Sequence, residues 1–163
     1  MKIGVVSDTH SRAIPKELIS DFKDVELIVH AGDFCSFEDF KIFSSLKEIK
    51  AVSGNMDELK LCQTLPKKII FQWNGFSIGV YHGHGLANKV LDSVKEEFKK
   101  DKVDAIIFGH SHVPFNERIG DILYFNPGSP NDLVIAPFCS YGFLEIVNNK
   151  LFGRIIKIKN KHG

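Results

Sequence analysis

The chain has 163 residues, the length of one domain, and 44% of them are hydrophobic against 25% charged, which excludes a chain that is disordered over most of its length. Its 21 lysines and arginines nearly balance its 20 aspartates and glutamates, so no overall charge attracts nucleic acid or an anionic membrane. An anionic substrate would therefore have to be recognised locally.

The first third of the sequence predicts alternating strands and helices. Short apolar runs rich in β-branched residues, typical of buried strands, occur at residues 2–7, 25–31 and 49–53. Helices are expected between them at residues 15–22 and 36–46, where Pro15 suits a first helical turn and Ser36 suits an N-cap. This alternation predicts parallel strands joined by right-handed crossovers.

The rest of the sequence predicts hairpins around one further helix. Asn74-Gly75 joins two apolar runs, residues 67–73 and 76–82, and is typical of a type I′ turn. Residues 86–100 predict an amphipathic helix, because apolar side chains recur there every four residues. A buried strand is expected at 103–108, and antiparallel strands joined by turns such as Asn148-Asn149 are expected at 122–125, 141–147 and 151–158. Together these elements predict two sheets packed face to face, with helices on their outer sides.

Polar side chains directly follow five of the predicted strands. They are Asp8 and His10, then Asp33, then Asn55 and Asp57, then His82 and His84, and finally His110 and His112. Ligands of open α/β sheets bind beyond the carboxyl ends of the strands, so these side chains are expected at one rim. Residues two apart in extended backbone point to the same side about 6–7 Å apart. The pairs Asp8/His10 and His110/His112 could thus straddle two metal ions.

The donor types indicate which metals such a site would bind. Carboxylate, imidazole and amide without thiolate suit Mn, Fe, Ni or Zn, and are too rich in nitrogen for Ca or Mg alone. One ion cannot use seven donors, whereas two ions about 3.5–4 Å apart that share a carboxylate can. Each position taken alone is more typical of a turn or a capping residue. Only their conjunction favours a metal site.

These motifs resemble a known family. Asp8-x-His10, Gly32-Asp33, Gly54-Asn55-x-Asp57, His82-Gly83-His84 and Gly109-His110-x-His112 stand in the order found in the calcineurin-like metallophosphoesterase superfamily. The small size and the segment Asn126-Pro127-Gly128-Ser129 make the chain most similar to the compact prokaryotic YfcE-type phosphodiesterases. The resemblance implies an α/β fold, a four-layer αββα sandwich of two mixed sheets flanked by helices. It also implies two divalent metal ions per chain, with Mn or Ni favoured and Fe or Zn as alternatives.

The resemblance further implies a role for each donor. One metal ion would be held by Asp8, His10, Asp33 and His112. The other would be held by Asp33, Asn55, His82 and His110, with Asp33 bridging the two. Asn55 and His110 would also act on the substrate, and His84 is a candidate for the same role.

Met56 departs from the family pattern. The wider superfamily usually has a histidine at this position, which acts on the leaving group, and methionine cannot donate a proton. This favours substrates whose leaving group needs little protonation, or an acid from elsewhere. His84 is one candidate acid, although a packing role or a backbone hydrogen bond is the more ordinary interpretation. Asp57 is expected to hold a ligand or a loop by hydrogen bonds.

Two other signals are interpreted as structural. Residues 75–79 match the G-x-S-x-G pattern of serine hydrolases, but Ser77 lies inside a predicted strand instead of at a strand-to-helix turn. His30, at the end of a buried strand, is expected to be a hydrogen-bonded core residue.

The three cysteines, Cys35, Cys62 and Cys139, form no CxxC pair, which argues against a disulfide framework. No apolar run approaches the roughly 20 residues of a membrane span, so a cytoplasmic, single-domain protein over residues 1–163 is expected.

The resemblance implies a metal-dependent phosphodiesterase that hydrolyses small organic phosphodiesters by attack of a hydroxide bridging the two metal ions. Two alternatives stay open: a catalytically weak protein-interaction scaffold on the same fold, as in a retromer subunit, and a nuclease. The complete donor set argues against the scaffold. The near-zero net charge argues against the nuclease. A small phosphoester is the expected partner, without membrane or nucleic acid, and a homodimer is left open.

Overall fold

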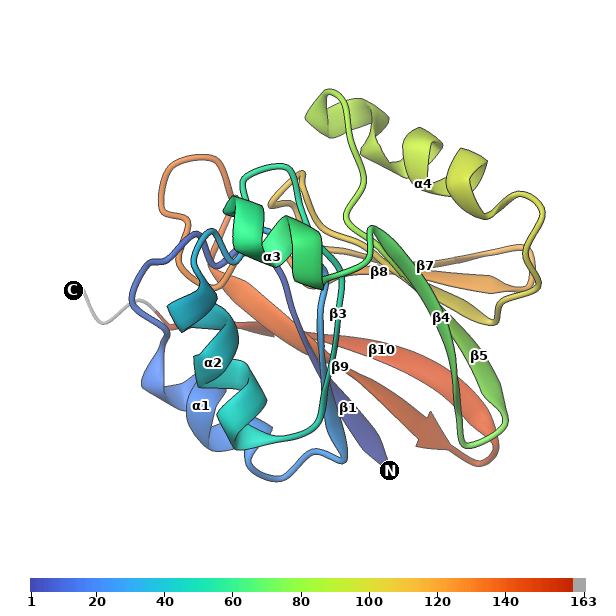
Figure 1. Ribbon diagram of the computed structural model, residues 1–163. Coiled ribbons are helices and arrows are strands. Elements are labelled where there is room, and N and C mark those ends of the chain that lie inside the picture. The colour runs from blue at the N-terminus through green and yellow to red at the C-terminus, as the bar shows by residue number, and fades with distance from the viewer. Residues whose placement is uncertain (160–163) are drawn as a thin grey trace.

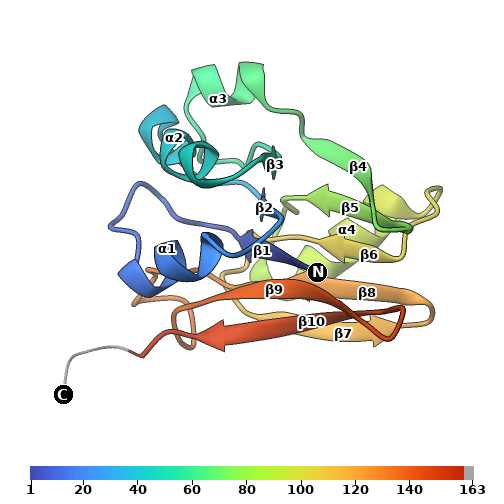
Figure 2. The same cartoon turned by 90° about the horizontal axis from the view of Figure 1, so that it is seen from below.

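The computed structural model describes residues 1–159, and its strands form two five-stranded sheets (Figures 1 and 2). The first sheet contains β1 (Lys2–Val6), β2 (Leu27–His30), β3 (Ile49–Ala51), β9 (Ser140–Val147) and β10 (Lys150–Lys157). The second contains β4 (Lys68–Trp73), β5 (Phe76–Tyr81), β6 (Ala105–Ile107), β7 (Phe115–Ile119) and β8 (Ile122–Asn126). The helices are α1 (Lys16–Phe22), α2 (Phe37–Leu46), α3 (Leu59–Thr64) and α4 (Val90–Phe98), which follows the 3-10 turn η1 (Ala87–Lys89).

Alternation along the strands builds the layers. In β1, Ile3 and Val5 join the apolar cluster between the two sheets, whereas Val6 points into the cluster beneath α1 and α2. A third cluster lies between α4 and the second sheet. Figure 1 shows α1, α2 and α3 gathered on one side and α4 on the other. The result is the expected α/β sandwich of two mixed sheets flanked by helices.

Close packing of α1 against the first sheet depends on one glycine. A Cβ atom added to Gly4 would lie 2.9 Å from the ring of Phe22, a buried residue at the end of α1. No side chain could therefore stand at this position of β1 without moving the helix outward.

The two turns predicted from paired residues are present. Asn74 and Gly75 have φ values of 48° and 88°, and Asn148 and Asn149 have values of 50° and 56°. These left-handed conformations are the ones a type I′ hairpin turn requires. β4 and β5 pair in the predicted register around the first turn.

The hairpins predicted at β4–β5 and β9–β10 are present, but they do not form a sheet separate from the parallel strands. The sheet orders are β10-β9-β1-β2-β3 and β4-β5-β6-β8-β7, so the last hairpin returns to the first sheet and β9 runs antiparallel to β1. β8 pairs in parallel with β6. The local sequence specifies that a segment is extended. Which strand it pairs with depends on the arrangement that buries the apolar faces of both sheets.

Two elements were not predicted. β7 pairs with β8 at the edge of the second sheet, and four of its five residues are exposed, so it lacks the apolar run that reveals a buried strand. The short α3 buries only Leu61 and has no side-chain N-cap. The helix expected at 86–100 begins as the 3-10 turn η1 and continues as α4. Within the described residues, no helix is long and apolar enough to cross a membrane.

Candidate metal centre

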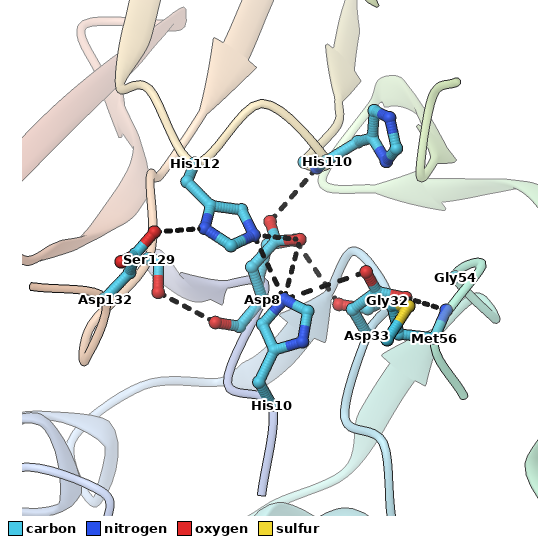
Figure 3. Close-up of polar contacts among 12 residues, drawn as sticks. Asp8, His10, Gly32, Asp33, Gly54, Met56, His110, His112, Ser129 and Asp132 are labelled. Carbon is cyan, nitrogen blue, oxygen red and sulfur yellow. Dashed lines mark hydrogen bonds and ion pairs between the residues drawn. The ribbon is translucent and has the colours of Figure 1, made fainter. Parts of the chain in front are cut away.

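Two groups of donor side chains meet beyond the carboxyl ends of the strands. The first group is Asp8, His10 and His112, and the second is Asp33, His82 and His110. Within each group, one potential ligand atom per residue lies within 4.8 Å of the others. The residues follow β1, β2, β5 and β6, so each sheet contributes to both groups. Figure 3 shows His10 and His112 turned toward Asp8, with Asp33 beside them.

The backbone at the donors is strained. Positive φ values occur at Asp8 (57°), His10 (48°), Asp33 (59°), His110 (67°) and His112 (59°). A left-handed conformation costs about 1–3 kcal/mol for a residue other than glycine, and persists where the surrounding structure imposes it. The expectation of extended backbone is therefore wrong for both pairs, Asp8/His10 and His110/His112, because the chain turns sharply at all four residues. The side chains of the first pair nevertheless meet, with His10 Nε2 3.8 Å from Asp8 Oδ1.

Asp8 is the most deeply buried donor, with 0% of its surface exposed. Its Oδ2 accepts the backbone N–H of His110 at 3.1 Å, but its Oδ1 has no hydrogen-bond partner among the described residues. That oxygen lies 3.4 Å from Nε2 of His112 and 3.9 Å from Nε2 of His82. Burial raises the pKa of Asp8, but the contacts with His10 and His112 outweigh it and hold the pKa well below its usual range. An ionised carboxylate oxygen that has no hydrogen-bond partner and is surrounded by imidazoles is suited to bind a cation.

The orientation of His112 supports the same conclusion. Its Nδ1 donates to Asp132 Oδ2 at 2.5 Å, which leaves Nε2 to face Nε2 of His10 at 3.0 Å. Burial lowers the pKa of His112, but Asp8 and Asp132 outweigh it and raise the pKa to about 9. The raised pKa means that, without a metal ion, His112 holds a proton on Nε2, so that its lone pair does not face that of His10 Nε2. A divalent cation would replace this proton.

The second group has a similar arrangement around Asn55. His82 Nδ1 donates to the carbonyl of Ala31 at 2.7 Å, and His110 Nε2 donates to the carbonyl of Gly85 at 2.8 Å. Their remaining ring nitrogens lie 3.1 Å and 3.0 Å from the same atom, Asn55 Oδ1. These three atoms would direct lone pairs at one another if both rings were neutral. A cation between them would satisfy all three.

Asp33 lies between the two groups. Its Oδ2 is 3.2 Å from His82 Nε2 and 3.7 Å from His10 Nε2. Its Oδ1 accepts the backbone N–H of Met56 at 2.7 Å. Burial lowers the pKa of His82, but the contact with Asp33 and the charge of Asp8 raise it to about 9. One carboxylate thus reaches histidines of both groups.

Asp57 holds the loops that carry Asp33 and Asn55. Its carboxylate accepts backbone N–H groups from Gly54 at 2.7 Å, Cys35 at 2.8 Å and Asp33 at 3.2 Å. This confirms the expectation that Asp57 acts on a loop by hydrogen bonds. Gly54 is required here because an added Cβ would lie 2.1 Å from Asp33 Oδ1.

Asp132 is a site residue that the sequence analysis missed. It is 3% exposed, and besides His112 it accepts backbone N–H groups from Val134, Ile135 and Ala136 at 2.8–3.3 Å. Burial raises its pKa, but these hydrogen bonds, with that of His112 first, lower it to about 2. It stands 20 residues from His112 in a loop without a strand-end signal, so no local pattern marks it. In Figure 3, Asp132 and Asp8 lie on opposite sides of the His112 ring.

The remaining candidates lie outside the two groups. His84 is exposed and its Nδ1 lies 3.0 Å from the hydroxyl of Tyr81. His30 is fully buried and bonded to Thr9 Oγ1 and to the N–H of Gly32, and burial lowers its pKa to about 3, which confirms its structural role. Ser77 lies within β5, as expected. Met56 is 58% exposed, and its backbone N–H donates to Asp33 Oδ1.

Comparisons with known proteins point to one family. Residues 1–149 match the family model of the calcineurin-like phosphoesterase superfamily domain. The chain is 42% identical to the probable metallophosphoesterase MJ0623 of Methanocaldococcus jannaschii, over 98% of this chain and 82% of that protein. It is 33% identical to the phosphodiesterase YfcE of Escherichia coli K12, over 89% of this chain and 88% of that protein.

Solved structures share the fold. An archaeal phosphodiesterase superposes with a TM-score of 0.77 at 27% identity, covering 96% of this chain and 100% of that one. A variant of Vps29 from Entamoeba histolytica superposes with a TM-score of 0.76 at 24% identity, covering 98% and 100%. The second likeness shows the fold alone.

Proposed function

The chain belongs to the calcineurin-like phosphoesterase superfamily, and its similarity to proteins named metallophosphoesterase and phosphodiesterase makes it a phosphoric ester hydrolase. We propose that it hydrolyses small organic phosphodiesters with two divalent metal ions. The observation that carries the proposal is the convergence of lone pairs at two adjacent points. At one of them, the buried Asp8 Oδ1 has no partner among the described residues. At the other, two imidazole nitrogens face Asn55 Oδ1.

These two points support the ligand set that the family resemblance implies. Asp8, His10, Asp33 and His112 would hold one ion. Asp33, Asn55, His82 and His110 would hold the other, with Asp33 shared. The mixture of carboxylate, imidazole and amide suits Mn, Fe, Ni or Zn, and the family resemblance favours Mn or Ni among them.

The chain's own residues orient the donors and position the substrate. Asp132 and the carbonyl of Ala31 each hold a histidine with Nε2 inward, so the lone pairs need no rearrangement. When bound, two cations lower the pKa of a coordinated water from 15.7 toward about 7, so that hydroxide is available at neutral pH. The amide N–H of Asn55, on the exposed side of the centre, would stabilise charge on the phosphate oxygens. His110 would act on the substrate only through the metal ion that it holds, because its Nε2 already donates to the carbonyl of Gly85.

Protonation of the leaving group is the weak step of this mechanism. The Met56 side chain cannot donate a proton. His84 is the remaining candidate, and its ring is hydrogen-bonded to Tyr81 on the exposed side of the chain. Substrates with stable leaving groups, such as aryl diesters, are therefore favoured.

Metal analysis combined with hydrolysis tests the proposal. The purified protein is stripped with a chelator, reloaded with Mn or Ni, and assayed with bis(p-nitrophenyl) phosphate and p-nitrophenyl phosphate. We expect two ions per chain and faster cleavage of the diester. A protein that binds no divalent metal, or that binds two and cleaves neither ester, would refute the proposed function and leave the scaffold as the better hypothesis.

Three broader predictions accompany this proposal. We infer that the protein acts in a reducing cytoplasm, supported by three unpaired cysteines in the described residues. Residues 1–163 would form a single domain, supported by the apolar cluster shared by both sheets. A homodimer remains a prediction, to be tested by the mass of the protein in solution.

A further inference from the structure

A cavity of about 390 Å³ lies beside the second donor group. Asn55 and His82 form one of its walls, so it opens onto the proposed metal centre. Lys67, Tyr81 and Cys62 also line the cavity. We call this cavity the Lys67 pocket. Its size is at the lower end of the range for small-molecule sites, about 300–1,000 Å³, and suits one organic substituent of a phosphodiester.

Lys67 carries the one permanent charge among the side chains that line the Lys67 pocket. No aspartate or glutamate is among its lining residues, all of which lie in the described part of the chain. Lys67 forms no ion pair with residues 1–159, whereas the neighbouring Lys68 contacts Asp101 at 2.7 Å and Glu97 at 3.5 Å. The ammonium group of Lys67 is therefore not neutralised by an acidic partner there, which makes it available to an anion.

The backbone of Lys67 is fixed in place beside the metal centre. Pro66, directly before it, accepts the N–H of Ser53 at 2.9 Å through its carbonyl. Lys68, directly after it, pairs with Tyr81 in the β4–β5 ladder. The backbone of Lys67 is thus held by its two neighbours. Pro66 is bonded to the segment that follows β3, and Lys68 pairs with Tyr81, the residue before His82.

We propose that the Lys67 pocket binds one organic substituent of the substrate and that Lys67 selects substituents that carry a second negative charge, a carboxylate or a phosphate. This inference rests on the proposed function, because the pocket serves the same site. A simple phosphodiester has one negative charge, which the cations would neutralise. A second negative charge on the substituent in the pocket would lie near Lys67, and no carboxylate among the lining residues would repel it.

A matched pair of substrates tests the selection. Phenyl p-nitrophenyl phosphate and 3-carboxyphenyl p-nitrophenyl phosphate differ only in the carboxylate, and both release nitrophenolate. In the Mn-loaded protein we expect Lys67→Gln to raise KM for the carboxylated ester about tenfold, with less than a twofold effect on the phenyl ester. The control is Lys60→Gln, since Lys60 lies on α3 over the ring of Phe37 and does not line the pocket. Equal effects on both esters would overturn the proposal.

A second measurement does not depend on catalysis. Cys62 is exposed and lines the pocket, so its alkylation by iodoacetamide, followed by peptide mass spectrometry, reports whether the pocket is filled. 3-Carboxyphenyl phosphate should slow the labelling of Cys62 at a lower concentration than phenyl phosphate does. This difference should vanish in Lys67→Gln.

The two measurements separate the hypotheses. Selective protection of Cys62 without hydrolysis of either ester would retain the pocket and refute the phosphodiesterase. Hydrolysis of both esters with identical protection by the two phosphates would retain the enzyme and refute the role of Lys67.

Discussion

Replacement of Asp132 by asparagine isolates the contribution of a residue that is not itself a proposed ligand. Asp132 Oδ2 accepts from His112 Nδ1 at 2.5 Å, and this contact holds Nε2 toward Asp8. Asparagine keeps one carbonyl oxygen for the N–H groups of Val134 and Ile135, which Oδ1 accepts at 2.8 Å and 3.1 Å. The loop should therefore survive while the charge behind His112 is lost.

The expected magnitude follows from the role of such outer contacts. Removing the partner of a metal-binding histidine typically lowers metal affinity about 10- to 100-fold, which corresponds to about 1.4–2.7 kcal/mol. Only the group of Asp8, His10 and His112 should be affected. The group of Asp33, His82 and His110 has separate orienting contacts, to Ala31 and Gly85.

Stepwise metal titration by calorimetry measures both affinities. We expect one weakened and one unchanged step in Asp132→Asn, with circular dichroism of the metal-free protein as a check on folding. Asp104→Asn is a suitable control, because Asp104 also accepts a backbone N–H, that of Ser77 at 2.7 Å, but belongs to neither donor group. Unchanged affinity in both steps, or an equal loss in both, would refute the reasoning.

Three further predictions concern other parts of the molecule. Asp33→Asn should reduce the metal content from two ions per chain toward one, because Asp33 Oδ2, the proposed shared ligand, lies 3.7 Å from His10 Nε2 and 3.2 Å from His82 Nε2; elemental analysis that still finds two ions per chain would contradict a bridging role. The folded-state pKa of His30, about 3, lies below its unfolded value of 6.5, so its contribution to stability is complete above pH 6.5 and is lost as the pH falls. Between pH 6.5 and 5 the metal-free wild type should lose about 2 kcal/mol more than His30→Gln in urea unfolding, and parallel pH profiles would contradict this. Met56→His should accelerate alkyl diesters more than nitrophenyl diesters, provided the imidazole reaches the leaving oxygen; kcat/KM over a leaving-group series measures this, and a flat series in the wild type would indicate that another acid, such as His84, already acts.

The sequence could predict the donors because their signals are local. Asp8, Asp33 and His82 each follow an apolar run that is buried as a strand, and the ends of such strands meet at one edge of a sheet. The hairpin turns at Asn74-Gly75 and Asn148-Asn149 are local for the same reason, since their φ values are set within the turn itself.

Only the tertiary structure could decide which distant segments meet. The hairpin of β9 and β10 pairs with β1, about 140 residues away along the chain, because both sheets then bury an apolar face. Asp132 reaches His112 across 20 residues of loop and strand, so its carboxylate acquires a role that no spacing rule contains. The left-handed backbone at Asp8 and His10 is likewise imposed by the surrounding contacts, since the intrinsic preference of both residues opposes it. Local preferences determine where each strand ends. Which other residues the strand end contacts is determined by burial and hydrogen bonding over the whole chain.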